Sequence, residues 1–196
     1  FSDTLIQLRN EVADLHEREC VWGLSGPARV QWYRFALRGE LFRLGRLVFQ
    51  FDLFRFKFRV FRHRTTRTVI ALSEGGVPFL ENGQANGPGR VRPAGEWPSE
   101  FAVNDDGVTG HLILPAGHAV RRKVHLPATE WQQVLAPNDP GVYLHFPGDG
   151  PLEHDLCSKS MEQAMAFFPR HFPDRPYNCF WSESWVFNSR LQELLP

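Results

Sequence analysis

The chain has 196 residues, with 22 Lys and Arg balanced by 22 Asp and Glu, so its formal charge is zero. This balance gives no reason to expect nucleic acid as a partner. No apolar run approaches the ~20 residues of a membrane helix, and no basic segment followed by an apolar stretch opens the chain, so we expect neither a membrane span nor a secretion signal. Seventeen Phe and six Trp predict a core rich in aromatic rings, or rings that line a pocket or a partner surface.

Cysteine and histidine spacing argues against disulfides and metals. Three cysteines, an odd number without short metal-type spacing, do not form a disulfide framework. We therefore expect reduced thiols and a cytoplasmic protein. The eight histidines include no HxH or HxxxH pair, and no C-x-x-C occurs, so we expect no metal site.

The first two elements are predicted to be helices. Apolar side chains recur with helical spacing near the start, at Leu5, Leu8, Val12 and Leu15. Residues 23–27 interrupt this pattern. A second helix is predicted to start near Pro27, a residue that suits the first turn, and to end near Gly39.

The next elements are predicted to be strands. From Arg43 to Phe51 the apolar period changes to two, which predicts one well-buried strand. From Phe54 to Val60, phenylalanines alternate with Arg and Lys, which predicts a half-buried antiparallel strand with residues 68–72 as its partner. Nine basic residues stand between Arg38 and Arg67 against two acidic ones. This excess either attracts anions or forms a solvated strand face.

The middle of the chain is rich in turn residues. Residues 75–98 contain six Gly and four Pro, which predicts a long loop without regular structure. Asn104 to Gly107 predicts a tight turn. Residues 108–114 and 119–126 are expected to form a hairpin, and residues 127–135 a short helix.

The last third predicts a strand, a turn, a helix and a second strand between Gly141 and Trp185. Residues 142–146 form the first strand, Pro147–Pro151 the turn, and residues 177–181 the second strand. Apolar residues between them recur at helical spacing, at Cys157, Met161, Ala164, Met165, Phe168 and Phe172. A strand, helix and strand in succession favour a parallel pair with a right-handed crossover.

The glycine-containing turn has chemistry of its own. Gly148 and Gly150 lead into a helix N-terminus, whose free backbone N–H groups and partial positive charge favour a phosphate or another anion. The same spacing also occurs where a strand merely ends and a helix starts. His145 before the turn is either a catalyst or a hydrogen-bonded core histidine. Glu183 and Ser184 after the second strand present a carboxylate and a hydroxyl, or merely cap a loop.

Several segments carry a family resemblance. They are Leu37–Phe49, Asn138–Leu152, Phe167–Tyr177 and Ser184-Trp185. In this order they resemble a bacterial, largely actinobacterial, acyltransferase family whose C-terminal domain has a GNAT-like fold. The resemblance covers most of the chain and is weakest in residues 75–98. It implies an α/β (α+β) fold, with a GNAT-like mixed sheet flanked by helices.

The resemblance also implies a domain organisation. Residues 1–196 would form a single GNAT-like domain, with residues 75–98 as a flexible insertion loop. A full GNAT sheet has two further strands, which we would expect after Pro196.

The resemblance implies an acyl-CoA-dependent N-acyltransferase. Acetyl-CoA or another acyl-CoA would be the co-substrate, and an amine of a small molecule or peptide the acceptor. The strand before the turn would bind pantetheine and the thioester, and the turn the pyrophosphate. The cofactor-binding positions would be Tyr143, Leu144, Phe146, Gly148, Asp149, Gly150 and Leu152. His145 or Glu183 would take the amine proton, and Ser184 would donate to the leaving thiolate.

The turn departs from the GNAT pattern, in which R/Q-x-x-G-x-G/A precedes the helix. Here the sequence is Pro147-Gly148-Asp149-Gly150, and the helix opens with Glu153-His154-Asp155, a poorer N-cap. The carboxylates of this segment suit the helix dipole but would repel a pyrophosphate. A non-catalytic GNAT-like binding or scaffold domain that has lost the cofactor therefore stays open as the alternative.

Overall fold

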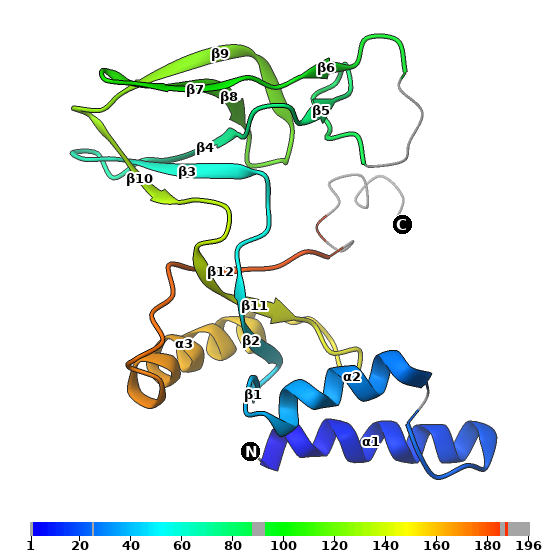
Figure 1. Ribbon diagram of the computed structural model, residues 1–196. Coiled ribbons are helices and arrows are strands. Elements are labelled where there is room, and N and C mark those ends of the chain that lie inside the picture. Colours follow the sequence, from blue (N-terminus) through cyan, green and yellow to red (C-terminus); the bar gives the residue numbers. More distant parts are fainter. Residues whose placement is uncertain (1, 25, 88–92, 185–186, 188–196) are drawn as a thin grey trace. The chain divides into compact units, whose positions relative to one another are not determined.

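The computed structural model describes residues 2–24, 26–87, 93–184 and 187 (Figure 1). The chain divides into two compact units. The first comprises residues 1–52 and 140–182, and the second comprises residues 53–139 and 183–196. The expectation of one domain over residues 1–196 stays a prediction.

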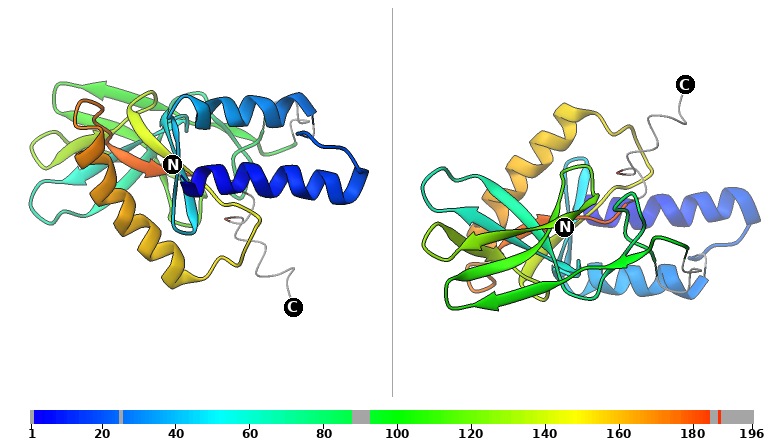
Figure 2. Two further views of the ribbon diagram at one scale, coloured as in Figure 1. Left: turned by 90° about the horizontal axis from the view of Figure 1, so that it is seen from below. Right: turned by 90° about the horizontal axis from the view of Figure 1, so that it is seen from above.

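The first unit combines helices with a four-stranded sheet in the order β1-β2-β11-β12. Its elements are α1 (Ser2–Glu19), α2 (Gly26–Leu37), β1 (Leu41–Leu44), β2 (Leu47–Leu53), β11 (Pro140–His145), α3 (His154–His171) and β12 (Cys179–Trp181). Figure 2 shows α1 and α2 as neighbouring helices, joined across the predicted break. Both N-terminal helices and the strand–helix–strand order are therefore confirmed, while Trp185 lies outside the described residues.

One face of the sheet packs against α3. The helix contributes Ala164 and Phe168, each at most 1% exposed, as its apolar spacing predicts. The Phe168 ring makes edge contacts with Phe42 at 5.6 Å and Phe49 at 6.0 Å between centroids. The buried members of this core are Phe42, Leu47, Phe49, Val142, Leu144, Ala164 and Phe168. The expected ring-rich core is therefore present in this unit.

β11 and β12 form the parallel pair that the sequence predicts. Their register runs from Gly141 opposite Cys179 to Tyr143 opposite Trp181. A Cβ atom on Gly141 would lie 2.9 Å from Cδ1 of Trp181 and 3.2 Å from the sulfur of Cys179. A glycine at this position is thus what lets the indole lie across the strand.

The prediction of a single strand between Arg43 and Phe51 is wrong. The structure has two strands instead, β1 and β2, paired antiparallel with Leu44 opposite Leu47. Gly45 supplies the positive φ of +64° that the two-residue turn needs. The alternation of apolar residues continues across this turn, which is why the period alone concealed it.

The second unit contains only strands among its described elements. They are β3 (Phe58–His63), β4 (Val69–Ser73), β5 (Pro78–Phe79), β6 (Trp97–Pro98), β7 (Phe101–Asn104), β8 (Gly107–Ile113), β9 (Ala119–Pro127) and β10 (Trp131–Leu135). The main sheet has the order β10-β3-β4-β8-β7, with β9 paired to β8. Phe61, Leu72 and Leu126 form its buried core.

Several predictions for this unit are confirmed. β4 pairs antiparallel with β3, and β8 and β9 form the expected hairpin. The turn before β8 is closed by the Asn104 side chain, whose oxygen accepts a hydrogen bond from the Gly107 amide at 3.1 Å.

Other predictions for this unit are wrong. Residues 131–135 form strand β10 rather than part of a helix, because β3 offers them an unpaired edge. β3 itself begins at Phe58 rather than Phe54. The loop over residues 75–98 contains the short antiparallel pair β5–β6, whose Phe79 and Trp97 are buried. The mixed α+β class of the chain is nevertheless the predicted one.

Candidate functional site

The candidate site lies within the first unit, where the turn Pro147–Pro151 joins β11 to α3. Glu153 precedes the helix in an extended conformation and makes no side-chain capping hydrogen bond. Asp155 stands in the first helical turn. The arrangement therefore has the helix N-terminus that the sequence predicts at this place.

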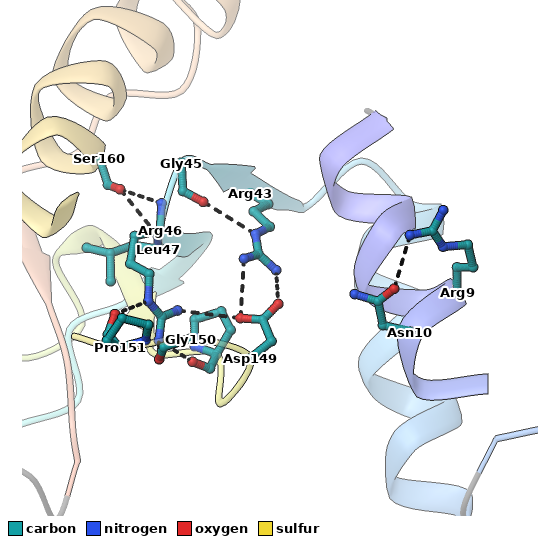
Figure 3. Close-up of polar contacts among 11 residues, drawn as sticks. Arg9, Asn10, Arg43, Gly45, Arg46, Leu47, Asp149, Gly150, Pro151 and Ser160 are labelled. Atoms are coloured by element: carbon teal, nitrogen blue, oxygen red, sulfur yellow. Dashed lines mark hydrogen bonds and ion pairs between the residues drawn. The ribbon is translucent and has the colours of Figure 1, made fainter. Parts of the chain in front are cut away.

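Arg46 fills the inside of the glycine-containing turn (Figure 3). It comes from the β1–β2 turn and is only 8% exposed. Its guanidinium donates to the backbone oxygens of Pro147 and Pro151, each at 2.6 Å, and to that of Gly150. Three backbone carbonyl groups of the turn therefore point at the buried guanidinium of Arg46.

Asp149 is held by two arginines. Arg43 donates to its two carboxylate oxygens, with Nη1–Oδ2 at 2.5 Å and Nη2–Oδ1 at 3.3 Å (Figure 3). Nη1 of Arg46 lies 3.6 Å from Oδ1 of the same carboxylate. The hydrogen bond from Arg43 lowers the pKa of Asp149, and the positive charges of both arginines act in the same direction. Asp149 is therefore an ionised carboxylate, seated where a ligand anion would meet the two guanidinium groups.

Ser160 on α3 anchors the β1–β2 turn. This fully buried hydroxyl accepts hydrogen bonds from the amides of Arg46 at 2.7 Å and Leu47 at 3.3 Å, and donates to the Leu156 oxygen. A Cβ atom on Gly45 would lie 2.9 Å from the same hydroxyl oxygen. The turn approaches the helix this closely because residue 45 is glycine.

A pocket of about 330 Å³ opens beside Asp149. It is lined by Asn10, Glu11 and Asp14 of α1 together with Asp149. Asp14 also pairs with Arg18 at 3.1 Å. The pocket wall is therefore acidic, with the two arginines behind Asp149.

His145, the predicted base, is the last residue of β11. Its Nε2 lies 3.1 Å from Oε1 of Gln50, and its ring lies 4.4 Å from that of Tyr143. Burial lowers the pKa of His145 to about 4, against an opposing contribution from the charge of Asp52. The imidazole is consequently neutral at physiological pH.

The predicted thioester strand has two different faces. Leu144 and Phe146 pack against the α3 core, whereas the Tyr143 ring lies 4.5 Å from that of Trp181. Pairing with β12 extends to Tyr143 and Trp181, after which the Ser182 hydroxyl donates to the Leu144 oxygen at 2.9 Å.

The remaining predicted residues lie between β11 and α3 or follow β12. A Cβ atom on Gly148 would meet nothing within 4 Å. Leu152 is 46% exposed. Glu183 is exposed and Ser184 half-buried, and both are grouped with the second unit. Their proximity to the glycine-containing turn stays a prediction.

Sequence reasoning did not assign Arg43, Arg46, Ser160 or Gln50 to the site. The basic excess between residues 38 and 67 was the available signal, because it contains both arginines. Nothing local to β1 or β2 indicates which of those cations turns inward. That choice depends on carbonyl groups about 100 residues further along the chain.

The described residues add three general findings. None of their helices is long and apolar enough to cross a membrane. No group of three His, Cys, Asp or Glu residues in the described ranges is placed to hold a metal ion. Cys20, Cys157 and Cys179 are not joined by disulfide bonds.

Strand, glycine-containing turn, amphipathic helix and parallel strand together form part of a mixed α+β fold. A family model described as the GNAT-like C-terminal domain matches residues 41–196, and the chain belongs to this family. It is thereby a member of the acetyltransferase superfamily in general. Searches of curated proteins and of solved structures found no match.

Proposed function

We propose that the protein is an acyl-CoA-dependent N-acyltransferase, which moves an acyl group from a CoA thioester to an amine of a small molecule or peptide. The observation that carries this proposal is the succession of strand β11, glycine-containing turn and α3, with β12 parallel to β11 and the helix N-terminus at the end of the turn. In this proposal β11 is the strand that binds the pantetheine. Family membership supports the same activity.

The chemistry demands orientation, a proton acceptor and stabilisation of charge on the thioester oxygen. The acceptor nitrogen attacks the thioester carbon, the carbon–sulfur bond breaks, and the sulfur leaves as a thiolate that takes up a proton. In this proposal Tyr143, Leu144 and Phe146 hold the pantetheine and thioester. Gly148, Asp149, Gly150 and Leu152 form the turn that receives the pyrophosphate.

The proton-transfer roles fall to His145, Glu183 and Ser184. A neutral imidazole can accept a proton, and its pKa of about 4 makes His145 a weaker base than an ordinary histidine. Glu183 is the alternative base, and Ser184 the donor to the thiolate. Three cysteines without disulfide bonds suit the reducing cytoplasm as the location of the enzyme.

Calorimetric titration with acetyl-CoA and longer acyl-CoAs tests the proposal. We expect binding to the unmodified chain and its loss in Gly148→Glu, since the new carboxylate repels the pyrophosphate. The space around Gly148 lets this variant fold. Ala116→Glu, which adds the same charge to an exposed turn of the second unit, is the matched control and should bind normally. No binding of any acyl-CoA to the unmodified chain would refute the proposal.

The alternative is a GNAT-like binding or scaffold domain without cofactor. The specific observation in its favour is the Asp149 carboxylate, which already occupies both arginines at the turn. A chain that binds no acyl-CoA, even when Asp149 is neutralised, would favour this alternative.

A further inference from the structure

We infer that Asp149 is a displaceable latch on an arginine anion site, in which Arg43 and Arg46 bind a phosphate group of a ligand once the carboxylate has moved away. This inference extends the proposed function to the regulation of the same turn. It does not require acyl transfer, because it concerns the phosphate group alone.

The first observation is the incomplete hydrogen bonding of Arg46. Its Nη1 is buried and has no hydrogen-bond partner among the described residues, although Nε and Nη2 are both satisfied by the turn. The nearest acceptor of opposite charge is Oδ1 of Asp149, at 3.6 Å, beyond hydrogen-bonding distance. A buried guanidinium nitrogen in this state is costly and favours an additional acceptor.

The second observation is the match between phosphate chemistry and the two guanidinium groups. Arg43 forms a fork with the carboxylate, the geometry that arginine also uses for phosphate. Arg43 and Arg46 both face the Asp149 carboxylate, while Glu11 and Asp14 line the adjoining pocket. A phosphate dianion has more charge and more acceptor oxygens than a carboxylate, so it can satisfy Arg43 and the remaining Nη1 of Arg46 together.

The third observation is the ease with which Asp149 can leave. Its side chain is 33% exposed, whereas that of Arg46 is 7% exposed, so the carboxylate is the more mobile partner of this pair. The pocket of about 330 Å³ beside it gives the displaced side chain and the incoming anion room. Glu11 and Asp14 line the same pocket and weaken the binding of any anion there, so the contacts with Arg43 and Arg46 have to outweigh this repulsion.

Titration with inorganic pyrophosphate tests the latch directly. If the latch is closed in about nine of ten molecules, Asp149→Asn tightens pyrophosphate binding about tenfold. Glu100→Gln is the matched control, because Glu100 forms an exposed ion pair with Lys123 at 2.7 Å in the second unit. This control should leave pyrophosphate binding unchanged.

The double variant Asp149→Asn with Arg43→Gln separates a specific site from general charge. It should lose the gain in affinity, since the fork that receives the phosphate is gone. Unchanged or weaker binding to folded Asp149→Asn would overturn the inference. A gain that persists in the double variant would do the same.

A measurement on the unmodified chain covers the case in which Asp149→Asn does not fold. Saturating pyrophosphate should raise the pKa of the Asp149 carboxyl group, because the carboxylate loses its hydrogen bonds from Arg43. The ¹³C resonance of this carboxyl group, recorded as a function of pH, measures the pKa. No change in that titration would overturn the latch.

The two proposals fail in distinguishable ways. Pyrophosphate binding that follows the expected order of variants, in a chain that binds no acyl-CoA, would sustain the latch and refute the transferase. Acyl-CoA binding that is equal in the unmodified chain and in Asp149→Asn would sustain cofactor binding and refute the latch.

Discussion

Two hairpin turns of this protein obey the same local rule and have different surroundings. The β1–β2 turn contains Gly45 at φ +64°, and the β8–β9 turn contains Gly117 at φ +81°. A Cβ atom would meet nothing within 4 Å at Gly117, but would meet the Ser160 hydroxyl at Gly45. One turn is an exposed connection, while the other is held by a helix and carries Arg46 into the candidate site. A glycine at positive φ is therefore common to both hairpins. The residues that pack against each turn determine whether it also contributes to a site.

Of the changes that test this difference between the hairpins, removal of the buried Arg46 should have the largest effect. Arg46→Met takes away the donor to three turn carbonyls and the charge beside Asp149. We expect a loss of about 4 kcal/mol in the free energy of unfolding, measured by urea denaturation. Arg122→Met, at an exposed position of β9 after the other hairpin turn, is the control and should change it little. Similar losses in both variants would contradict the difference between the hairpins.

The pH dependence of the free energy of unfolding tests the surroundings of the first hairpin through His145. His145, bonded to Gln50 of the first hairpin, has a folded-state pKa of about 4, below its ordinary value of 6.5, because it is buried. Between these values the unfolded chain binds the proton and the folded chain does not. Stability is therefore full above pH 6.5 and falls as the pH drops towards 4, by up to about 3 kcal/mol.

The variant His145→Gln should remove this component of the pH dependence between 6.5 and 4. His125→Gln, the same exchange at an exposed position of β9, serves as the control for the substitution itself. If both variants retain the full slope, burial of His145 is not its source.

The smallest expected effect concerns the glycines themselves. Gly45→Ala and Gly117→Ala both place a side chain at positive φ, which costs about 1 kcal/mol or slightly more. Gly45→Ala must also push back the Ser160 hydroxyl, so we expect a total of about 2 kcal/mol for it and about 1 kcal/mol for Gly117→Ala. Thermal unfolding of the two variants measures this difference. Equal losses of stability would mean that Ser160 on α3 moves away from the new methyl group without an energetic cost.

Sequence reasoning succeeded where one element carries its own pattern. The apolar positions of α3 reappear in the structure as the face containing Ala164 and Phe168, packed on the sheet, except for Met165, which is 53% exposed. The parallel pairing of β11 with β12 followed from a strand, a helix and a strand in order. In both cases the pattern lies within a few turns of the chain.

Reasoning from the sequence failed where a distant partner decides the outcome. Residues 131–135 became a strand because β3 offers them an edge, which no local periodicity reveals. The glycine-containing turn was expected from its N–H groups, but its carbonyls also bind Arg46, which lies about 100 residues earlier. Charge counting detected the basic segment without distinguishing the buried Arg46 from its solvated neighbours. Tertiary contacts alone make that distinction.

The first unit is discontinuous, since residues 53–139 separate its two parts. During synthesis, β1 and β2 leave the ribosome long before β11 and α3 exist. Until then the rings of Phe42 and Phe49, later covered by Phe168, have no apolar partner from the second half. The nascent chain therefore passes through a stage at which it exposes aromatic surface, and translation speed and chaperones bear most strongly on its yield at that stage.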